Sequence, residues 1–586
     1  MKVTDYVAEF LVRQGISTVF GYQGSSIAHM IDSLSKNPRI CFVENRHEQA
    51  AAFSAVGYAQ ASGHLGAALA CSGPGALNLL TGIADAYYDS IPVIFLTGQV
   101  SQKEMKVDAD LRQFGFQETS IVDIVRPITK YAKTVTRPEE IPYVLESAAQ
   151  AALSGRPGPV LVDMPHNIQG ANIELSEIHA VPVNHDDASA RKTMIKEKDF
   201  VFLRQSLEHA KRPVFLLGGG CGRLASRIQD ELHQSGIPIV VSYRGKNVYD
   251  NTADNYCGVV GVYGDRSANW ILRYSDCIIS IGSRMDGRQT GGEIFQDEFN
   301  TDVFVIDLDS SELRKLPSCY YKIQADATEA LEIIFLDGLH LQKEDIKRWS
   351  ACVHSWREQY PIAEEYPLQD GVNPNLFLKE IRSRNKDKQI YIVDVGQNQL
   401  WTNVSVDVGP SQLLLQSAGL GAMGFALPAA IGASFAADRE PVICITGDGG
   451  IQMNLQELQT ISCYHVPVKI ILLNNKSLGL IRDYQKKALH GNLIGSVEGF
   501  GSPNYEQIAS AYGISYLSIK DNTQIEEASA ELNSNRPCLI EVMISTDSIV
   551  SPEPTYGDTL LNQSQELPQE DLEKVKEQVK CLEQKR

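Results

Sequence analysis

Two motifs in the last third of the chain combine oxygen donors that could hold a divalent cation. Gly447-Asp448-Gly449 follows the apolar run PVICIT, and Asn474-Asn475 follows the apolar run VPVKIILL, so Asn475 comes 27 positions after Asp448. This separation fits one strand–helix–strand crossover, which puts both motifs at the carboxyl edge of neighbouring parallel strands, where α/β proteins bind ligands. Mg²⁺ is typically held by few protein carboxylates together with amide, carbonyl and phosphate oxygens. The pair therefore indicates a magnesium site, whereas GDG alone would most often be a tight turn.

A carboxyl group near the start of the chain is the second candidate for chemistry. Glu48 lies in ENRHEQAAAFSAVGYAQASG, where a predicted strand ends and a helix of small residues begins. A glutamate at a helix start usually serves only as a partner of the helix dipole or as a cap. From the residues alone, a structural role and a catalytic role both stay open.

Short apolar runs such as PVIFLTG, PVFLLGGG and CIISIG alternate with longer amphipathic stretches along the chain. This alternation is typical of βαβ units, and strands that are apolar on both faces belong in parallel sheets covered by helices. Composition changes near 174–194 and 342–367 divide the pattern. We therefore expect an α/β fold of three doubly wound parallel-sheet domains, at residues 1–170, 195–340 and 370–550. A C-terminal tail or lid, with a helix beginning near Pro568, is expected at 551–586.

The composition is typical of a folded protein and argues against binding to polyanions. Of 586 residues, 43% are hydrophobic, and 53 basic against 72 acidic residues give a net charge of −19, which would repel nucleic acid and anionic membranes. The 11 cysteines form no CxxC pair, so neither a zinc site nor a disulfide framework is indicated. The N-terminus lacks a secretory signal, and the uncharged stretch 408–437 has glycines and Pro428 that favour a packed buried helix. We expect a cytoplasmic protein without nucleic-acid or membrane partners.

These motifs and several longer segments are similar to those of one enzyme family. RHEQ-AA-x(5)-GYA, FGYQGSSI (20–27), the GDG and NN pair and SAGLGAMGFALPAAIGAS (417–434) all resemble thiamine-diphosphate enzymes of the acetolactate synthase type. The resemblance implies that Glu48 bonds N1′ of the cofactor's aminopyrimidine and that Asp448, Asn475 and the carbonyl of Ser477 hold Mg²⁺. Met423 would support the bent form of the cofactor. The other implied contacts are Gly24, Ser72, Pro74, Asn78, Gly396, Gln397, Asn398, Gly421, Gly447, Gly449, Gly450, Leu478 and Gly479.

The middle third resembles the flavin-binding half of the same family. It carries GGGCGR (218–223), GSRMDGRQTGG (282–292) and VIDLDSSE (305–312). The resemblance implies a structural FAD without a part in electron transfer, and surface charges in a vestigial domain are the alternative. The implied contacts are Arg156, Gly218, Gly219, Gly220, Arg284, Asp307 and Asp326.

Three further residues are expected to act on the substrates. Gln117 and Lys130 lie in FQETSIVDIVRPITKYAKTV (116–135), which also resembles the family. Arg288 matches a family arginine that approaches the carboxylate of the acceptor, a task that suits the fork of a guanidinium group.

Several positions depart from the family pattern around the acceptor. The loop that usually reads GYPGG has Gln23, Ser25 and Ser26, a family Trp is replaced by Tyr484, and FDDR has become MDGR through Gly287. We expect decarboxylation of pyruvate and carboligation of its two-carbon unit to a keto acceptor. The alternatives are transfer to a nucleotide-linked keto sugar and a catalytically silent flavoprotein or regulatory partner.

The family places the glutamate and the diphosphate site in different subunits. The resemblance therefore implies a homodimer or a dimer of dimers, with a regulatory subunit as a further partner to consider.

Overall fold

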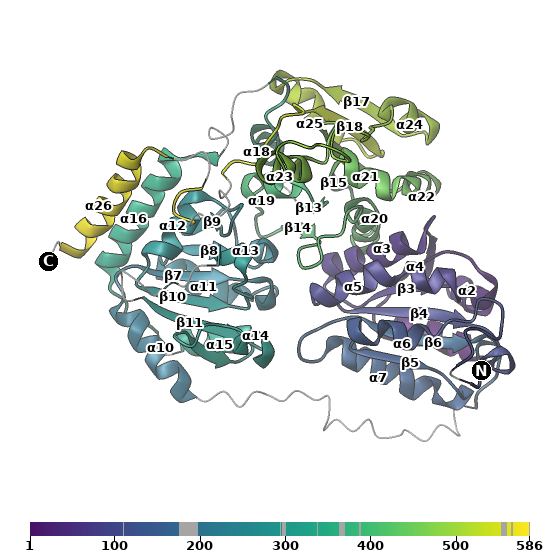
Figure 1. The fold of residues 1–586 in the computed structure, drawn as a ribbon. Helices are drawn as coiled ribbons and strands as arrows, with labels where there is room; N and C mark the ends of the chain where they lie inside the picture. Colours follow the sequence, from purple (N-terminus) through teal and green to yellow (C-terminus); the bar gives the residue numbers. More distant parts are fainter. Residues whose placement is uncertain are drawn as a thin grey trace.

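The computed structural model describes residues 1–108, 110–174, 197–292, 295, 301–336, 338–362, 370–385, 388–552, 560–563 and 567–584. Three six-stranded sheets follow one another along the chain, and every pairing between neighbouring strands within them is parallel. Helices cover both faces of each sheet (Figure 1). The expected α/β fold with three doubly wound parallel sheets is confirmed.

The N-terminal sheet has the strand order β2-β1-β3-β4-β6-β5. Its strands are β1 (Thr18–Gly21), β2 (Cys41–Glu44), β3 (Gly66–Ala70), β4 (Val93–Gln99), β5 (Tyr131–Thr134) and β6 (Val160–Pro165). Its helices are α1 (Val3–Arg13), α2 (Ala28–Lys36), α3 (Glu48–Ser62), α4 (Pro74–Asn78), α5 (Leu80–Tyr88), α6 (Ile121–Val125), α7 (Ile141–Leu153) and α8 (His166–Gln169). β3, β4 and β6 are buried along their whole length, as strands covered on both faces must be.

The middle sheet has the order β12-β11-β10-β7-β8-β9. Its strands are β7 (Pro213–Leu217), β8 (Ile239–Val241), β9 (Tyr256–Val259), β10 (Cys277–Ile281), β11 (Asp302–Asp307) and β12 (Tyr321–Gln324). Its helices are α10 (Glu197–His209), α11 (Ser226–Ser235), α12 (Arg266–Tyr274), α13 (Gly287–Thr290), α14 (Ser310–Arg314), α15 (Ala327–Phe335) and α16 (Lys343–Gln359).

The C-terminal sheet has the order β14-β13-β15-β16-β18-β17. Its strands are β13 (Gln389–Val393), β14 (Gln412–Gln416), β15 (Val442–Gly447), β16 (Val468–Asn474), β17 (Ser515–Ile519) and β18 (Cys538–Met543). Its helices are α18 (Pro374–Arg384), α19 (Gln397–Ser405), α20 (Ala426–Ala436), α21 (Asp448–Met453), α22 (Leu458–Tyr464), α23 (Gly479–Ala488), α24 (Tyr505–Ala511) and α25 (Ile525–Leu532).

In each sheet the chain first adds strands on one side of the first strand and then crosses to its other side. The reversal lies between β1 and β3 in the first sheet, between β7 and β10 in the second, and between β13 and β15 in the third. At such a switch point the loops after the two strands turn to opposite faces and leave a crevice at the carboxyl ends, where ligands of open α/β sheets bind. The fold therefore provides three positions for ligands.

Helices α3 and α20 join the first and third domains at very close range. A Cβ added to Gly57 would lie 2.2 Å from Ala429 O, and one added to Gly432 would lie 1.8 Å from Ser54 O. Ser54 Oγ donates to Pro428 O at 2.9 Å across the same contact. Every residue of α20 from Ala426 to Phe435 is buried, which explains the uncharged stretch of sequence. No helix within the described residues has the length and apolar character needed to cross a membrane.

The end of the chain packs against the middle domain. Helix α26 (Gln569–Gln584) lies beside α16, away from the C-terminal sheet (Figure 1). Val575 and Val579 are buried in one cluster with Trp356, whose Nε1 donates to Gln578 Oε1 at 2.7 Å. Within 551–586, expected to be a tail or lid, residues 560–563 and 567–584 thus form a covering layer of the middle domain.

Candidate functional site

Glu48 is the first residue of α3 and is held by a neighbouring amide. The helix begins there because His47 caps it, with its ring accepting a hydrogen bond from the N–H of Gln49 at 3.1 Å. Only 8% of Glu48 is exposed, and Asn78 Nδ2 donates to its Oε2 at 2.9 Å. A Cβ added to Gly75 would lie 3.0 Å from Glu48 Oε1. The carboxylate is therefore fixed against the loop after β3, at the switch point of the first sheet.

The loops after β1 and β3 meet beside this carboxylate. A Cβ on Gly24 would lie 2.5 Å from the Cβ of Cys71. Gly73, with φ of 64°, packs against Gln117, whose own φ of 65° is uncommon for a residue with a side chain. Backbone strain of this kind occurs at functional sites more than elsewhere. Around Glu48 the structure gathers the predicted residues Gly24, Ser72, Pro74, Asn78 and Gln117.

The loops after β13, β15 and β16 meet at the switch point of the C-terminal sheet. Asn475 Nδ2 donates to the buried Gln397 Oε1 at 2.9 Å, and Gln397 Nε2 donates to Asp483 Oδ2 at 2.8 Å. A Cβ on Gly479 would lie 1.9 Å from Gln397 Oε1, so this contact requires glycine. The structure gathers here the predicted residues Gly396, Gln397, Asn398, Gly447, Asp448, Gly449, Gly450, Asn475, Ser477, Leu478 and Gly479.

Asp448 is almost fully buried beside the loop after β16. Burial raises the pKa of its carboxyl from the usual 3.8 to about 6. Hydrogen bonds oppose this rise, from Ser502 Oγ to Oδ2 at 2.7 Å and from the backbone N–H of Lys476. In the same loop the N–H of Ser477 donates to Asn475 Oδ1 at 3.2 Å.

A metal at this edge would depend on mixed oxygen donors. Among the described residues, no three His, Cys, Asp or Glu side chains come together as a metal site. One carboxylate, one amide oxygen and one backbone carbonyl, from Asp448, Asn475 and Ser477, are the donors that these loops offer. Such a set suits Mg²⁺ better than zinc or copper.

Met423 packs over the first turn of α21. A Cβ on Gly449 would lie 3.4 Å from Met423 Cε and 2.4 Å from Leu478 Cδ2, so three loops converge at this glycine. Met423 is half-buried and follows Gly421, which has φ of 67°. The predicted pair Gly421 and Met423 therefore adjoins the residues around Asp448.

The sequence analysis missed the residues that hold these loops in place. Asp394 follows β13, and its carboxylate accepts from the N–H groups of Gly424 at 3.0 Å and Ala426 at 3.2 Å. Burial raises the pKa of Asp394 to about 7. An acidic residue directly after an apolar strand could have identified Asp394 in the sequence, as this pattern identified Asp448. Ser502 and Asp483 lie in a loop and a helix distant in sequence, and no local pattern marks them.

The switch point of the middle sheet opens into a cavity of about 380 Å³. Its walls include the predicted flavin residues, which are Arg156, Gly219, Gly220, Arg284, Asp307 and Asp326, while Gly218 packs below them with its Cβ position 2.1 Å from Gly282 O. Residues of all three domains line it, including Asp89 from the first and Gly419 from the third. The cavity is therefore a junction between domains.

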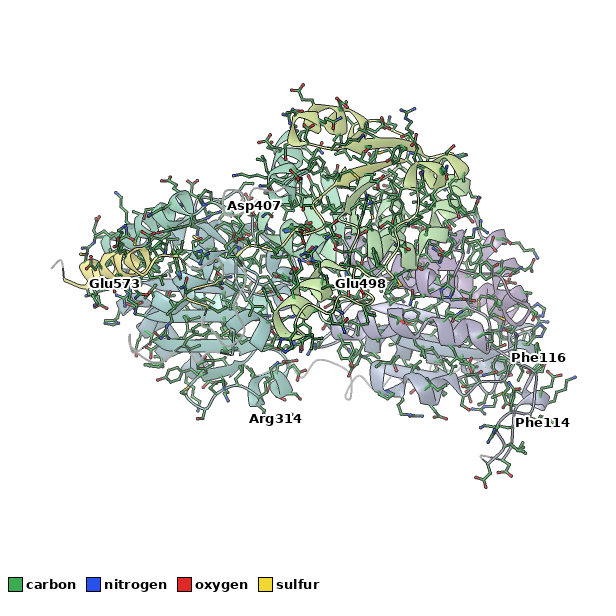
Figure 2. The ribbon with its side chains drawn as sticks, turned by 45° about the horizontal axis from the view of Figure 1, so that its top comes forward. Phe114, Phe116, Arg314, Asp407, Glu498 and Glu573 are labelled. Atoms are coloured by element: carbon green, nitrogen blue, oxygen red, sulfur yellow. The ribbon has the colours of Figure 1, made fainter. Side chains whose placement is uncertain are left out.

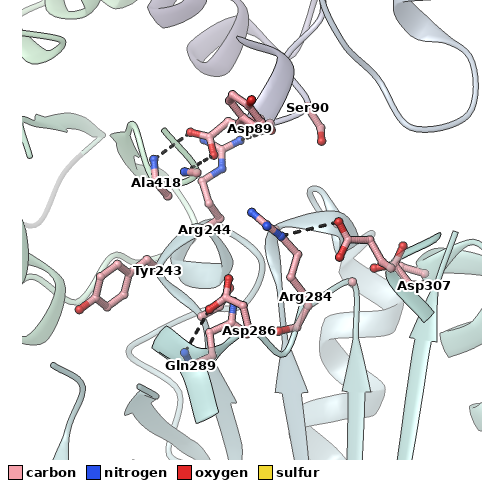
Figure 3. Close-up of a pocket in the computed structure, with 18 of the residues that line it drawn as sticks. Asp89, Ser90, Tyr243, Arg244, Arg284, Asp286, Gln289, Asp307 and Ala418 are labelled. Carbon is pink, nitrogen blue, oxygen red and sulfur yellow. Dashed lines mark hydrogen bonds and ion pairs between the residues drawn. The ribbon is translucent and has the colours of Figure 1, made fainter. Parts of the chain in front are cut away.

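Charged side chains of both signs line this cavity. Arg156 Nη1 lies 3.2 Å from Asp309 Oδ2 and 3.1 Å from Glu312 Oε1. Burial raises the pKa of Asp307 at the end of β11. Figure 3 shows Arg244 and Arg284 extending into the space between the first and middle domains, with Asp89 above them. Arg244 and Asp89 were not predicted, and no sequence motif marks them.

Two of the expected catalytic residues lie away from Glu48. Lys130 comes just before β5, at the amino edge of the first sheet, where its Nζ donates to Ser154 O at 2.5 Å and burial lowers its pKa to about 8. Since Glu48 and its neighbours lie at the carboxyl edge, the structure does not bring Lys130 to them within one chain. Arg288 lies on α13 and lines the cavity of the middle domain.

The two halves of the predicted thiamine site are not joined directly. No hydrogen bond or ion pair between described residues links Glu48 to Asp448. Their neighbours are linked, since Asn454 Nδ2 donates to Gln49 Oε1 at 3.4 Å and the N–H of Arg46 donates to Glu457 Oε1 at 2.8 Å. Tyr484, on α23, is 52% exposed in the single chain.

Comparison with known proteins gives matches along most of the chain. Three family models match in order: the N-terminal TPP binding domain of thiamine pyrophosphate enzymes over residues 1–126, their central domain over 202–334 and their C-terminal TPP binding domain over 394–542. The acetolactate synthase isozyme 2 large subunit of Escherichia coli (strain K12) is 34% identical over 558 residues, covering 93% of this chain and 96% of that protein.

Other relatives agree. The acetolactate synthase large subunit of Lactococcus lactis subsp. lactis (strain IL1403) is 33% identical over 554 residues, 93% of each chain. That of Porphyra purpurea is 32% identical over 528 residues, covering 88% of this chain and 87% of that protein.

Proposed function

This chain belongs to the thiamine pyrophosphate enzymes, of the acetolactate synthase large-subunit type, and from that premise we propose its reaction. Pyruvate loses carbon dioxide, and its two-carbon remainder forms a carbon–carbon bond with the carbonyl carbon of a second keto compound. The proposal is supported above all by two groups of residues at two switch points. One is the Glu48 carboxylate, which Asn78 holds in place, and the other is the cluster of Asp448, Asn475 and Gln397.

Glu48 would hold a proton at N1′ of the aminopyrimidine. When bound, thiamine diphosphate supplies a nucleophilic carbon and an electron sink for decarboxylation of a 2-keto acid. Glu48 suits the proton-holding task because it is buried and because Asn78 keeps one of its oxygens in place, which leaves Oε1 for the ligand. Met423 and Leu478 would form the apolar support beside the cofactor, with water excluded.

Mg²⁺ would be held by Asp448, Asn475 and the carbonyl of Ser477. The donor set fits a hard cation that completes its shell with phosphate oxygens and water. Gln397 fixes the amide of Asn475, because Asn475 Nδ2 donates to it and thereby leaves Asn475 Oδ1 turned toward the loop of Ser477. The metal would neutralise the diphosphate and orient it at this edge of the sheet.

FAD would occupy the cavity of the middle domain as a structural cofactor. Arg284 Nε is buried without a hydrogen-bond partner among the described residues, and it forms a long ion pair with Glu312 Oε1 at 3.7 Å. A diphosphate would supply the missing acceptor. Asp307 at the end of β11 lies where α/β proteins hold the ribose of a dinucleotide. The residues present therefore fit the flavin.

Carboligation is favoured over simple release of an aldehyde. The residue beside Gly73 is Gln117, an amide that does not donate a proton as an active-site histidine would. Arg288 in the cavity wall would bind the carboxylate of the acceptor through its guanidinium fork. Pyruvate is the acceptor that we favour, with a nucleotide-linked keto sugar as the rival.

The complete site would be formed by two copies of the chain. Exposed apolar side chains lie on both halves, Leu77, Phe114 and Phe116 on the first domain and Met453 and Ile481 on the third. Figure 2 shows Phe114 and Phe116 at the periphery of the first domain. A contact between two copies would bury these side chains, as protein interfaces bury exposed apolar surface. The relatives are named large subunits, so a smaller partner subunit is also proposed.

Products formed from pyruvate alone test the proposed reaction. Purified protein with thiamine diphosphate and Mg²⁺ is expected to release carbon dioxide and acetolactate in equal amounts, and to be yellow if flavin is bound. EDTA should abolish turnover, and Mg²⁺ with thiamine diphosphate should restore it. A burst of one carbon dioxide per site without acetolactate would favour another acceptor, such as the keto sugar, and steady carbon dioxide release with acetaldehyde would contradict carboligation. Turnover indifferent to metal would contradict the Asp448 assignment.

A further inference from the structure

Arg288 is carried by a helix of only one turn. Helix α13 spans Gly287–Thr290, and its first end is capped by Asp286, whose Oδ1 accepts from the N–H groups of Arg288 at 3.0 Å and Gln289 at 3.3 Å. Its other end is Gly291, with φ of 65°. So short a helix is not stable by itself, because nucleation is costly and few hydrogen bonds repay it. The direction of Arg288 therefore depends on what supports α13 from outside.

The first support is the turn Gly261–Gly264 after β9. The N–H of Val262 donates to Arg288 O at 2.8 Å. Gly261 has φ of 123°, and a Cβ there would lie 2.5 Å from Arg288 O, so the turn touches α13 without room for a side chain. The turn is closed by the N–H of Gly264, which donates to Gly261 O at 2.8 Å.

The second support is the segment Leu560–Gln563 from the end of the chain. Gln563 is fully buried, and its Nε2 donates to Val262 O at 3.3 Å and Gly264 O at 3.2 Å. Leu560 packs on the other end of α13, where a Cβ on Gly291 would lie 2.9 Å from Leu560 Cγ. The segment also has its own anchor, since Trp270 Nε1 donates to Leu561 O at 2.8 Å. It therefore contacts both the turn that supports Arg288 and the helix that carries it.

We propose that Leu560–Gln563 sets the position of Arg288 toward the acceptor, with Gln563 as the positioning residue. This inference rests on the proposed function, in which Arg288 binds the acceptor's carboxylate. The segment lies beyond residue 542, where the match to the C-terminal family model ends. Acceptor use is thus controlled in part from a region outside the three matched domains.

The test compares two tail glutamines that both bond to the middle domain. Gln563→Met keeps the length of the side chain and removes the donors to Val262 and Gly264. Gln578→Met is the matched control. It removes the hydrogen-bond partner of Trp356, and it lies on α26, outside the segment Leu560–Gln563. We expect Gln563→Met to lower kcat/KM for the acceptor about tenfold, since small displacements of a binding group have effects of this size. Carbon dioxide release in a single turnover with enzyme in excess should stay within about twofold, and Gln578→Met should change neither.

Hydrogen exchange of the full-length protein provides a readout that is independent of activity. Gln563→Met and the second variant Leu560→Ala should each speed exchange in peptides 260–266 and 286–292, with no change in α3. In Arg288→Met, adding Gln563→Met should cause no further loss of acceptor use, because the two act as one unit. Unchanged exchange at 286–292, or an equal loss of both reaction steps, would overturn the positioning role. If wild-type protein released no carbon dioxide from pyruvate, the proposed function would fail while the exchange result could still hold.

Discussion

At the scale of single residues, substitutions of Glu48 and Tyr484 test two different steps. Glu48 tests the decarboxylation of pyruvate, and Tyr484 tests which acceptor is used. Glu48→Gln keeps the shape of the side chain and, with its amide oxygen, an acceptor for Asn78, but it removes the acid–base group. We expect carbon dioxide release to fall by about 10²- to 10⁴-fold while thiamine diphosphate still binds. Rapid-quench measurement of carbon dioxide and cofactor titration would check both. Glu44→Gln, at the end of β2 and paired with Arg46, is the control, and normal turnover of Glu48→Gln would exclude the mechanism.

Tyr484→Trp tests the acceptor side. The resemblance described above leads us to expect Trp at this position, as a residue that would favour the larger acceptor 2-ketobutyrate. Tyr484 is exposed in the single chain and so has room for the larger ring. We expect the variant to raise the ratio of 2-ketobutyrate product to acetolactate roughly tenfold or more, the range that one methylene group is worth in a pocket. Competition between the two keto acids measures this ratio. A ratio equal to that of the wild type would show that other residues choose the acceptor.

At the scale of elements, a substitution at the close contact of α3 with α20 should lower both the stability of the protein and its turnover. In Gly432→Ala the new methyl group would meet Ser54 O at 1.8 Å, so α3 must move away. We expect a loss of about 1–3 kcal/mol of unfolding free energy, the cost of overpacking a core, and reduced turnover because Glu48 begins the displaced helix. Thermal unfolding and turnover measure the two effects. Gly501→Ala, which meets no atom within 4 Å, should leave both unchanged, and an equally harmless Gly432→Ala would contradict the contact.

A second element-scale prediction concerns β6 and pH. Asp163 in β6 accepts hydrogen bonds from Thr97 Oγ1 in β4 at 2.7 Å and from Thr134 Oγ1 in β5 at 3.0 Å, and burial raises its pKa to about 7. Because the folded pKa lies above the unfolded value near 3.8, the unfolded chain gives up this proton first as pH rises. This group therefore lowers stability with rising pH between about 4 and 7, by up to about 1.4 kcal/mol per pH unit, and has a constant effect above that.

Asp163→Asn should remove this dependence. We expect the variant to be similar to the wild type at pH 4 and more stable than it at pH 8, as measured by denaturant unfolding at each pH. Asp123→Asn, an exposed residue on α6, provides the matched change without burial. A stability difference that stays constant across this range would show that Asp163 is ionised throughout.

At the scale of the whole molecule, the separation of the two half-sites predicts complementation between inactive variants. Glu48→Gln and Asp448→Asn each damage one half. If each site takes one half from each of two chains, mixed dimers contain one intact site, and random mixing should restore about a quarter of wild-type activity. The measurement is turnover after the two variants are unfolded and refolded together, with each variant refolded alone as the control. No recovery would show that each chain forms its own site.

The sequence predicted the fold, and it predicted which residues gather at two sheet edges, because those residues follow strands. Asp448 and Asn475 come at the ends of neighbouring apolar strands, and Glu48 begins the helix that follows β2. Parallel strands place such residues at one edge of a sheet. Lys130 comes before its strand and therefore lies at the opposite edge. Ser502, Arg244 and the packing of α26 were not predictable, because they depend on contacts between segments that are distant in the chain and carry no local pattern.

The covering of α16 by α26 also has a consequence for how the protein is made. The strands of the middle sheet end at Gln324, but Val575 and Val579, which help to cover Trp356, follow much later in the chain, after the whole C-terminal sheet. At about 5–20 residues per second, the apolar side of α16 waits on the order of tens of seconds on the ribosome without its cover. We infer that the middle domain reaches its final form only after α26 has been made, so a chain that stops before α26 would keep an intact first sheet and expose the apolar side of α16.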